Sequence, residues 1–185
     1  MENKIGIIGL GYVGLPLMVE MLKHYEVVGL DLDDERIKAL RSGNDYTNEV
    51  DDSILQELLS QGKLEISNKK DILEQVNFFI VTVPTPVDDS NVPNLNPLKS
   101  AITIIAEYLK KGDIVVIEST VFPGVTEEFC GPILEKISGL ILNKDFFMGY
   151  SPERINPGDK EHHLSKIVKI VSGSNNESLM KISKL

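Results

Sequence analysis

The chain has 185 residues and a formal net charge of −9, with 42% apolar and 25% charged residues, a composition typical of a globular protein rather than a disordered one. The acidic balance, without any stretch dense in Lys and Arg, argues against a nucleic-acid partner held through phosphates. A single cysteine, Cys130, excludes an internal disulfide framework and fits a reducing compartment.

The N-terminal segment 5–22 is nearly all apolar, but it is not a membrane anchor. Several glycines, Pro16 and Glu20 interrupt it, and no positively charged segment precedes it. We therefore expect a strand, a turn and a helix here, no membrane partner, and a cytoplasmic protein.

Apolar strands and amphipathic helices alternate along the whole chain. The expected strands are short apolar runs at residues 4–8, 27–31, 77–83, 113–118, 146–150 and 167–172. The expected helices cover residues 15–25, 33–42, 53–61, 71–76, 97–111, 126–137 (irregular around Gly131-Pro132) and 174–185. A polar, proline-bearing connection fills 84–97, and a loop fills 151–163. This alternation predicts a Rossmann-like, doubly wound α/β fold, with a mostly parallel sheet and helices on both faces.

The first expected turn carries the sequence Gly9-Leu10-Gly11-Tyr12-Val13-Gly14. It follows an apolar strand and opens a helix. An acidic residue ends the next strand, at the spacing that is typical of a dinucleotide-binding fingerprint. Gly9 suits the tight turn, Gly11 the approach of a pyrophosphate, and Gly14 close packing of helix on strand. The N–H groups of Tyr12 and Val13 would then face the phosphates.

Asp31 is the acidic residue of this pattern and favours NAD over NADP. Its carboxylate can accept hydrogen bonds from the adenosine ribose, whereas it would repel a 2′-phosphate. Arg36 is close enough in sequence to weaken that preference, although we expect it along the adenine edge. The alternative is a tight turn without a ligand.

Three later motifs accompany the fingerprint, and together the four resemble one family. They are Val83-Pro84-Thr85-Pro86, Glu118-Ser119-Thr120-Val121-Phe122-Pro123-Gly124 and Tyr150-Ser151-Pro152-Glu153-Arg154-Ile155-Asn156-Pro157-Gly158-Asp159. In this order they resemble the N-terminal NAD-binding domain of the UDP-glucose/GDP-mannose dehydrogenase family. The last motif most resembles the bacterial UDP-N-acetylglucosamine and UDP-N-acetylgalactosamine 6-dehydrogenases of surface-polysaccharide synthesis.

The resemblance implies oxidation of a sugar C6 alcohol to a carboxylate with two NAD+ per turnover, through a cysteine-bound thioester. It places the nucleophilic Cys and a Lys beyond Leu185, and nothing in the chain resembles the family's Gly-Gly-x-Cys segment. It also implies a homo-oligomer in the full-length enzyme, formed through a central helix beyond Leu185. We expect residues 1–185 to form one NAD-binding domain whose last helix is truncated.

The predicted site residues fall into three groups. The cofactor-binding residues are Gly9, Gly11, Tyr12, Val13, Gly14, Asp31, Arg36, Val83, Pro84, Thr85, Ser119 and Thr120. The resemblance makes Glu153 a catalytic residue that activates water, and makes Thr120 a second one near the reacting carbon. It gives the nucleotide-sugar substrate the contacts Glu153, Arg154, Ile155 and Asn156. Without the resemblance, a stiff proline loop would be the preferred interpretation of residues 83–86, and a strand-end hydroxyl and a surface ion pair would be common alternatives for the other two motifs.

Cys130 is not the expected nucleophile, since it falls inside a predicted helix, where free cysteines are usually inert core residues. The adjacent pair His162-His163 lacks metal-ligand spacing, and we expect no metal site. Two rival functions remain open: a module that binds NAD without complete chemistry, and another NAD oxidoreductase with a similar first half.

Overall fold

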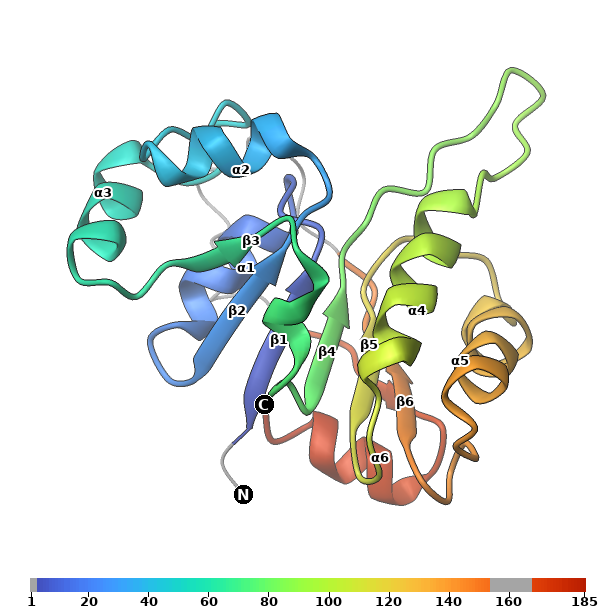
Figure 1. The fold of residues 1–185 in the computed structure, drawn as a ribbon. Coiled ribbons are helices and arrows are strands. Elements are labelled where there is room, and N and C mark those ends of the chain that lie inside the picture. Colours follow the sequence, from blue (N-terminus) through green and yellow to red (C-terminus); the bar gives the residue numbers. More distant parts are fainter. Residues whose placement is uncertain (1–2, 154–167) are drawn as a thin grey trace.

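The structure, a computed structural model, describes residues 3–153 and 168–185. Its described strands form one seven-stranded sheet in the order β3-β2-β1-β4-β5-β6-β7 (Figure 1). The strands are β1 Lys4–Ile8, β2 Glu26–Leu30, β3 Glu65–Ser67, β4 Phe78–Val81, β5 Ile114–Ile117, β6 Phe147–Tyr150 and β7 Ser172–Gly173. All neighbouring pairs are parallel except β6 and β7. The predicted mostly parallel α/β sheet is confirmed.

Helices cover both faces of this sheet (Figure 1). The α-helices are α1 Gly14–Met21, α2 Asp34–Arg41, α3 Asp52–Ser60, α4 Asn96–Tyr108, α5 Gly131–Ser138 and α6 Asn176–Ile182. A 3₁₀ helix, η1, spans Lys70–Leu73, and a π-helix, η2, spans Val125–Cys130. One face carries α4, α5, η1 and η2, and the other carries α1, α2, α3 and α6.

Side chains of the central strands alternate between two apolar cores. In β4, Phe79 and Val81 belong to the core under α4 and α5, whereas Phe78 and Ile80 belong to the core under α1 and α2. Both faces of a central strand are therefore buried, which explains its continuous apolar run.

The order of the strands reverses beside β1, which pairs with β2 on one edge and with β4 on the other. The connection after β1 leads to α1 on one face, whereas the connection after β4 leads to α4 on the opposite face (Figure 1). These connections diverge at the carboxyl ends of the two strands, where open α/β sheets bind their ligands.

The structure differs from the sequence prediction at the edges of the sheet. The three-residue β3 was not predicted, because only Ile66 in it is buried and it offers no apolar run. The predicted strand 167–172 is wrong in extent: residues 168–171 are not in a strand, and the short β7 runs antiparallel to β6. The predicted helix at 71–76 is instead the 3₁₀ helix η1.

The predicted irregular helix at 126–137 is confirmed as two pieces. The π-helix η2 ends at Cys130, and α5 begins at Gly131 with a proline in its first turn. A proline lacks the N–H that would continue the wider π-helical pattern, but it fits the first turn of an α-helix.

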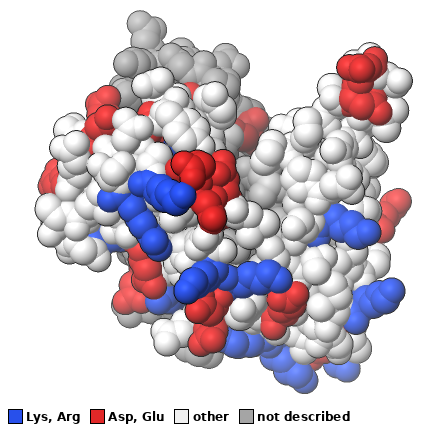
Figure 2. All heavy atoms as spheres, turned by 45° about the horizontal axis from the view of Figure 1, so that its top comes forward, with Lys and Arg blue, Asp and Glu red and all other residues white. Residues whose placement is uncertain are grey.

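In the described part of the chain, no helix is long and apolar enough to cross a membrane. Figure 2 shows basic side chains scattered among acidic ones on the face that it presents, rather than gathered into one broad basic patch. A surface of this kind does not favour binding to a phosphate backbone.

Candidate functional site

The glycine fingerprint forms the turn from β1 into α1. Gly9 has a φ of +96°, which side chains other than glycine rarely adopt. A Cβ on residue 14 would lie 1.8 Å from the carbonyl oxygen of Gly9, so only glycine lets the helix start so close to the strand. Both positions need glycine for the fold itself.

Gly11 differs from these two glycines, because the fold does not require glycine there. A Cβ there would have no atom of the described chain within 4 Å, so the turn leaves open space beside Gly11. The amino end of α1 follows, and among the described residues no side chain caps it at Val13. Open space at the amino end of a helix suits the close approach of a pyrophosphate.

Charged side chains hold the peptide groups of Leu10, between the first two glycines. The Leu10 N–H donates to the Asp31 carboxylate at 2.7 Å, and the Leu10 carbonyl accepts from Arg36 Nε at 2.7 Å. Asp31 also accepts from the N–H of Asp33 at 3.0 Å. Asp31, just after β2, therefore sits against the glycine turn, and Arg36 is buried beside it.

Hydroxyl groups connect the ends of β1, β4 and β5. Thr82 Oγ1 donates to the Gly9 carbonyl at 2.7 Å, and Ser119 Oγ donates to the Val83 carbonyl at 2.7 Å. Thr85 Oγ1 donates to the Thr120 carbonyl at 2.6 Å. These bonds fix the two loops that follow β4 and β5 side by side.

Glu153 belongs to a group of three charges at the carboxyl ends of β5 and β6. Lys169 Nζ lies 2.5 Å from Glu118 Oε2 and 3.3 Å from Glu153 Oε2, and both carboxylates are more than nine-tenths buried. Burial raises the pKa of the Glu118 carboxyl, Lys169 opposes the rise, and the neighbouring Glu153 adds to it. One ammonium group thus holds two carboxylates together at the carboxyl ends of β5 and β6.

These features surround one cavity of about 470 Å³, a size typical of ligand pockets. The cavity contains most of the residues that the sequence predicted, namely Gly9, Gly11, Tyr12, Val13, Asp31, Arg36, Val83, Pro84, Thr85, Ser119, Thr120 and Glu153. Gly14 is not in its wall but under the turn. Arg154, Ile155 and Asn156 lie outside the described residues.

The prediction missed several residues at this cavity. Asp33, Tyr46, Thr47, Thr82 and Glu118 also line it, and Lys169 reaches two of its carboxylates. Lys169 had a usable signal, because it is the one charged residue in an apolar run that was predicted to be a buried strand. A charge in such a run needs a partner, which a search of the nearby strand ends would have suggested.

Cys130 lies away from the cavity. It is fully buried in the core under α4 and α5, and burial raises the pKa of its thiol to about 12. Little thiolate would exist at neutral pH, which supports the interpretation that Cys130 is not a nucleophile. His162 and His163 lie outside the described residues, and within the described ranges no cluster of three metal-ligating side chains occurs.

The comparisons with known proteins agree with this geometry. A family model described as the NAD-binding domain of the UDP-glucose/GDP-mannose dehydrogenase family matches residues 3–185. The chain is 55% identical over 176 residues to a UDP-N-acetyl-D-glucosamine 6-dehydrogenase of Pseudomonas aeruginosa, which spans 95% of the chain and 41% of that protein. It is 50% identical over 173 residues to the enzyme of the same name from Salmonella typhi, over 94% of the chain and 40% of that protein.

A solved structure is similar as well. The UDP-D-ManNAc dehydrogenase of Pyrococcus horikoshii superimposes with a TM-score of 0.88 at 35% identity, over 98% of this chain and 43% of that one. The chain thus spans about two fifths of the length of these relatives. The match of nearly the whole chain to the family model, together with the glycine turn and Asp31, shows that this chain belongs to the UDP-glucose/GDP-mannose dehydrogenase family, as its NAD-binding domain.

Proposed function

We propose that this chain is the NAD-binding part of an enzyme that oxidises the C6 alcohol of a UDP-N-acetylhexosamine to the uronic acid. The observation that carries the proposal is one cavity whose wall contains both the dinucleotide turn and a buried glutamate, Glu153. A cofactor that accepts a hydride and a carboxylate that can take a proton are two of the groups that such an oxidation needs at one place.

The residues around the glycine turn fit NAD. The open space beside Gly11 and the helix N–H groups would take the pyrophosphate, and Asp31 would take the adenosine ribose hydroxyls. Held by these residues, NAD+ would supply the hydride acceptor for the oxidation. The Ser119 hydroxyl donates its hydrogen to the Val83 carbonyl. Ser119 therefore fixes the loop after β4 rather than donating to a ligand.

Glu153 is the proposed general base. Its carboxylate borders the cavity and is held by Lys169, which keeps it in one orientation. A base must stand within hydrogen-bond reach of the water that it activates. Thr120 borders the same cavity from the end of β5 and would position the reacting carbon or that water.

The sugar class rests on the relatives. Two proteins that share half or more of their aligned residues with this chain are named as UDP-N-acetyl-D-glucosamine 6-dehydrogenases. The structural relative acts, by its name, on the mannosamine epimer and is only 35% identical. We therefore propose the glucosamine epimer as the substrate, and a homo-oligomer as the complete enzyme.

A chimera tests this function. Residues 1–185 would replace the matching part of the Pseudomonas aeruginosa relative, and NADH would be followed with UDP-N-acetyl-D-glucosamine. We expect two NADH per sugar and a uronic acid product. In the chimera, Glu153→Gln should lower acid formation by about 10²–10⁴-fold, the usual contribution of a general base.

Glu107→Gln is the matched control, because Glu107 forms only an exposed ion pair with Lys70. It should leave the rate unchanged. A folded chimera that binds NAD+ yet forms no acid, or a Glu153→Gln chimera with the wild-type rate, would contradict the proposal.

A second candidate is a chain that binds NAD but performs no chemistry by itself. Burial of Cys130, the single thiol in the sequence, favours it, because a thioester route needs an accessible thiolate. The 185-residue chain mixed with NAD+ and UDP-N-acetyl-D-glucosamine should then form no uronic acid. Two NADH per sugar from that mixture would bring Cys130 back as a nucleophile.

A further inference from the structure

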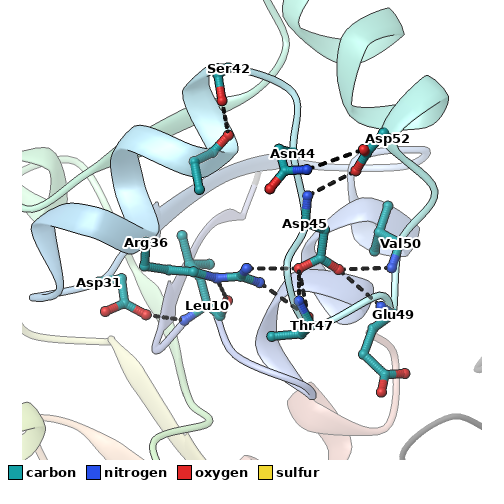
Figure 3. Close-up of polar contacts among 11 residues, drawn as sticks. Leu10, Asp31, Arg36, Ser42, Asn44, Asp45, Thr47, Glu49, Val50 and Asp52 are labelled. Carbon is teal, nitrogen blue, oxygen red and sulfur yellow. Dashed lines mark hydrogen bonds and ion pairs between the residues drawn. The ribbon is translucent and has the colours of Figure 1, made fainter.

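Arg36 lines the cavity, but its guanidinium group is bound by the protein itself. Only 2% of its surface is exposed, and each nitrogen of its guanidinium has a protein partner (Figure 3). Nε donates to the Leu10 carbonyl at 2.7 Å, Nη1 pairs with Asp45 at 2.7 Å, and Nη2 lies 3.4 Å from Thr47 Oγ1. The ring of Tyr46 covers one face of the group, 4.6 Å from Cζ.

Asp45 is as buried as Arg36 and is the centre of the turn after α2. Besides the bond from Arg36, one of its oxygens accepts from the N–H and hydroxyl of Thr47. The other accepts from the N–H groups of Glu49 and Val50 at 3.0 Å (Figure 3). Burial alone would raise the pKa of Asp45, but the hydrogen bonds outweigh burial and hold the pKa below its ordinary value. Asp45 is therefore a permanent negative charge beside a permanent positive one.

The Arg36–Asp45 ion pair determines which charges remain uncompensated in the part of the cavity around Asp31. Arg36 and Asp45 cancel each other, so Asp31 and Asp33 are left to set the sign of the potential there. An arginine placed a few residues after the second strand is the kind of group that accommodates a 2′-phosphate when its guanidinium is available. Here the guanidinium is committed to Asp45 and to the glycine turn.

We propose that Asp45 determines cofactor specificity: by binding Arg36 it withholds the guanidinium from a 2′-phosphate and so makes the site selective for NAD over NADP. The inference rests on the proposed binding of NAD in this cavity. Asp45 does not line the cavity and would act through Arg36, so it is a positioning residue.

The test is isothermal titration of NAD+ and NADP+ into the 185-residue chain and three variants. Asp45→Asn keeps the shape of the side chain and removes its charge. It should lower the ratio of the NADP+ to the NAD+ dissociation constant by about tenfold or more, chiefly by tightening NADP+, because a freed arginine gains a charge-assisted hydrogen bond to phosphate. In the double variant Asp45→Asn/Arg36→Met that gain should disappear.

An unchanged ratio in Asp45→Asn, or the same gain in the double variant, would overturn the inference. The third variant, Asp31→Asn, tests it with the ion pair intact. NAD+ should still bind more tightly than NADP+, since Asp45 still holds Arg36; tighter NADP+ binding would overturn the inference. A wild-type chain that binds neither cofactor would refute the proposed function as well, whereas NAD+ binding with an unchanged ratio refutes this inference alone.

Discussion

Two glycines of the fingerprint serve different purposes, although the motif treats them alike. Gly14 has the Gly9 carbonyl where its Cβ would be, and Gly11 has open space there. The fold therefore requires glycine at position 14 but not at position 11, and we infer that the open space beside Gly11 admits the ligand. Only the three-dimensional structure separates these two positions, since both are simply glycines in the sequence.

The difference predicts opposite behaviour for two alanine variants. Gly14→Ala should lower the free energy of unfolding by about 2–4 kcal/mol, because the new methyl group overlaps backbone. Gly11→Ala should change it by less than about 1 kcal/mol yet weaken NAD+ by about tenfold or more, as its methyl group occupies the space of the pyrophosphate. Urea unfolding and NAD+ titration of both variants measure this. A Gly11→Ala chain that binds NAD+ normally would show that the pyrophosphate lies elsewhere.

At the scale of the elements, a buried ion pair joins the strand end of β5 to the segment after β6. Lys169→Met would leave Glu118 buried without its ammonium partner. We expect a loss of about 2–4 kcal/mol in the free energy of unfolding at pH 8 and a smaller loss at pH 5. The sign follows because burial raises the pKa of Glu118 in the folded state and removal of Lys169 raises it further, so the folded variant takes up a proton at low pH and loses stability as the pH rises.

Lys38→Met is the control for this variant, because Lys38 and its partner Glu35 are both largely exposed. It should leave the free energy of unfolding nearly unchanged at either pH, because water screens an exposed ion pair. Urea unfolding at the two pH values compares them. An equal loss at pH 5 and pH 8 for Lys169→Met would show that its packing, not its charge, matters.

The turn between α4 and β5 contains a second buried carboxyl. Burial raises the pKa of Asp113 to about 6, although the Lys110 N–H donates to it at 2.8 Å. Because the folded pKa exceeds the unfolded one, stability from this group is present at low pH and is lost as the pH rises through about 6. Asp113→Asn should therefore gain about 1 kcal/mol relative to wild type between pH 4 and pH 7, measured by urea unfolding. No gain would mean that the carboxyl is solvated.

Most elements were predictable because the strands are short apolar runs buried on both faces. The predictions failed where burial is one-sided, as in β3, and where the side chains of an apolar run are exposed, as at Val168 and Ile170. The type of helix was also not predictable. The spacing of apolar residues does not distinguish the 3₁₀ helix η1 or the π-helix η2 from an α-helix.

At the scale of the whole molecule, parallel strands explain why four motifs distant in sequence meet. All of them follow the carboxyl ends of strands, and in a parallel sheet those ends share one edge. The sequence could therefore place Asp31, Thr120 and Glu153 around one site. It could not place Tyr46 or Thr47, since their turn is fixed by the Arg36–Asp45 pair, which only tertiary structure reveals.

NAD binding in this cavity underlies both the proposed function and the role proposed for Asp45, and isothermal titration of NAD+ and NADP+ into the 185-residue chain measures it. We predict one NAD+ per chain, weaker binding of NADP+, and a loss of about 1–3 kcal/mol in NAD+ binding on Asp31→Ala, the scale for losing hydrogen bonds to a charged group. No binding of NAD+, or binding of NADP+ as tight as that of NAD+, would contradict it.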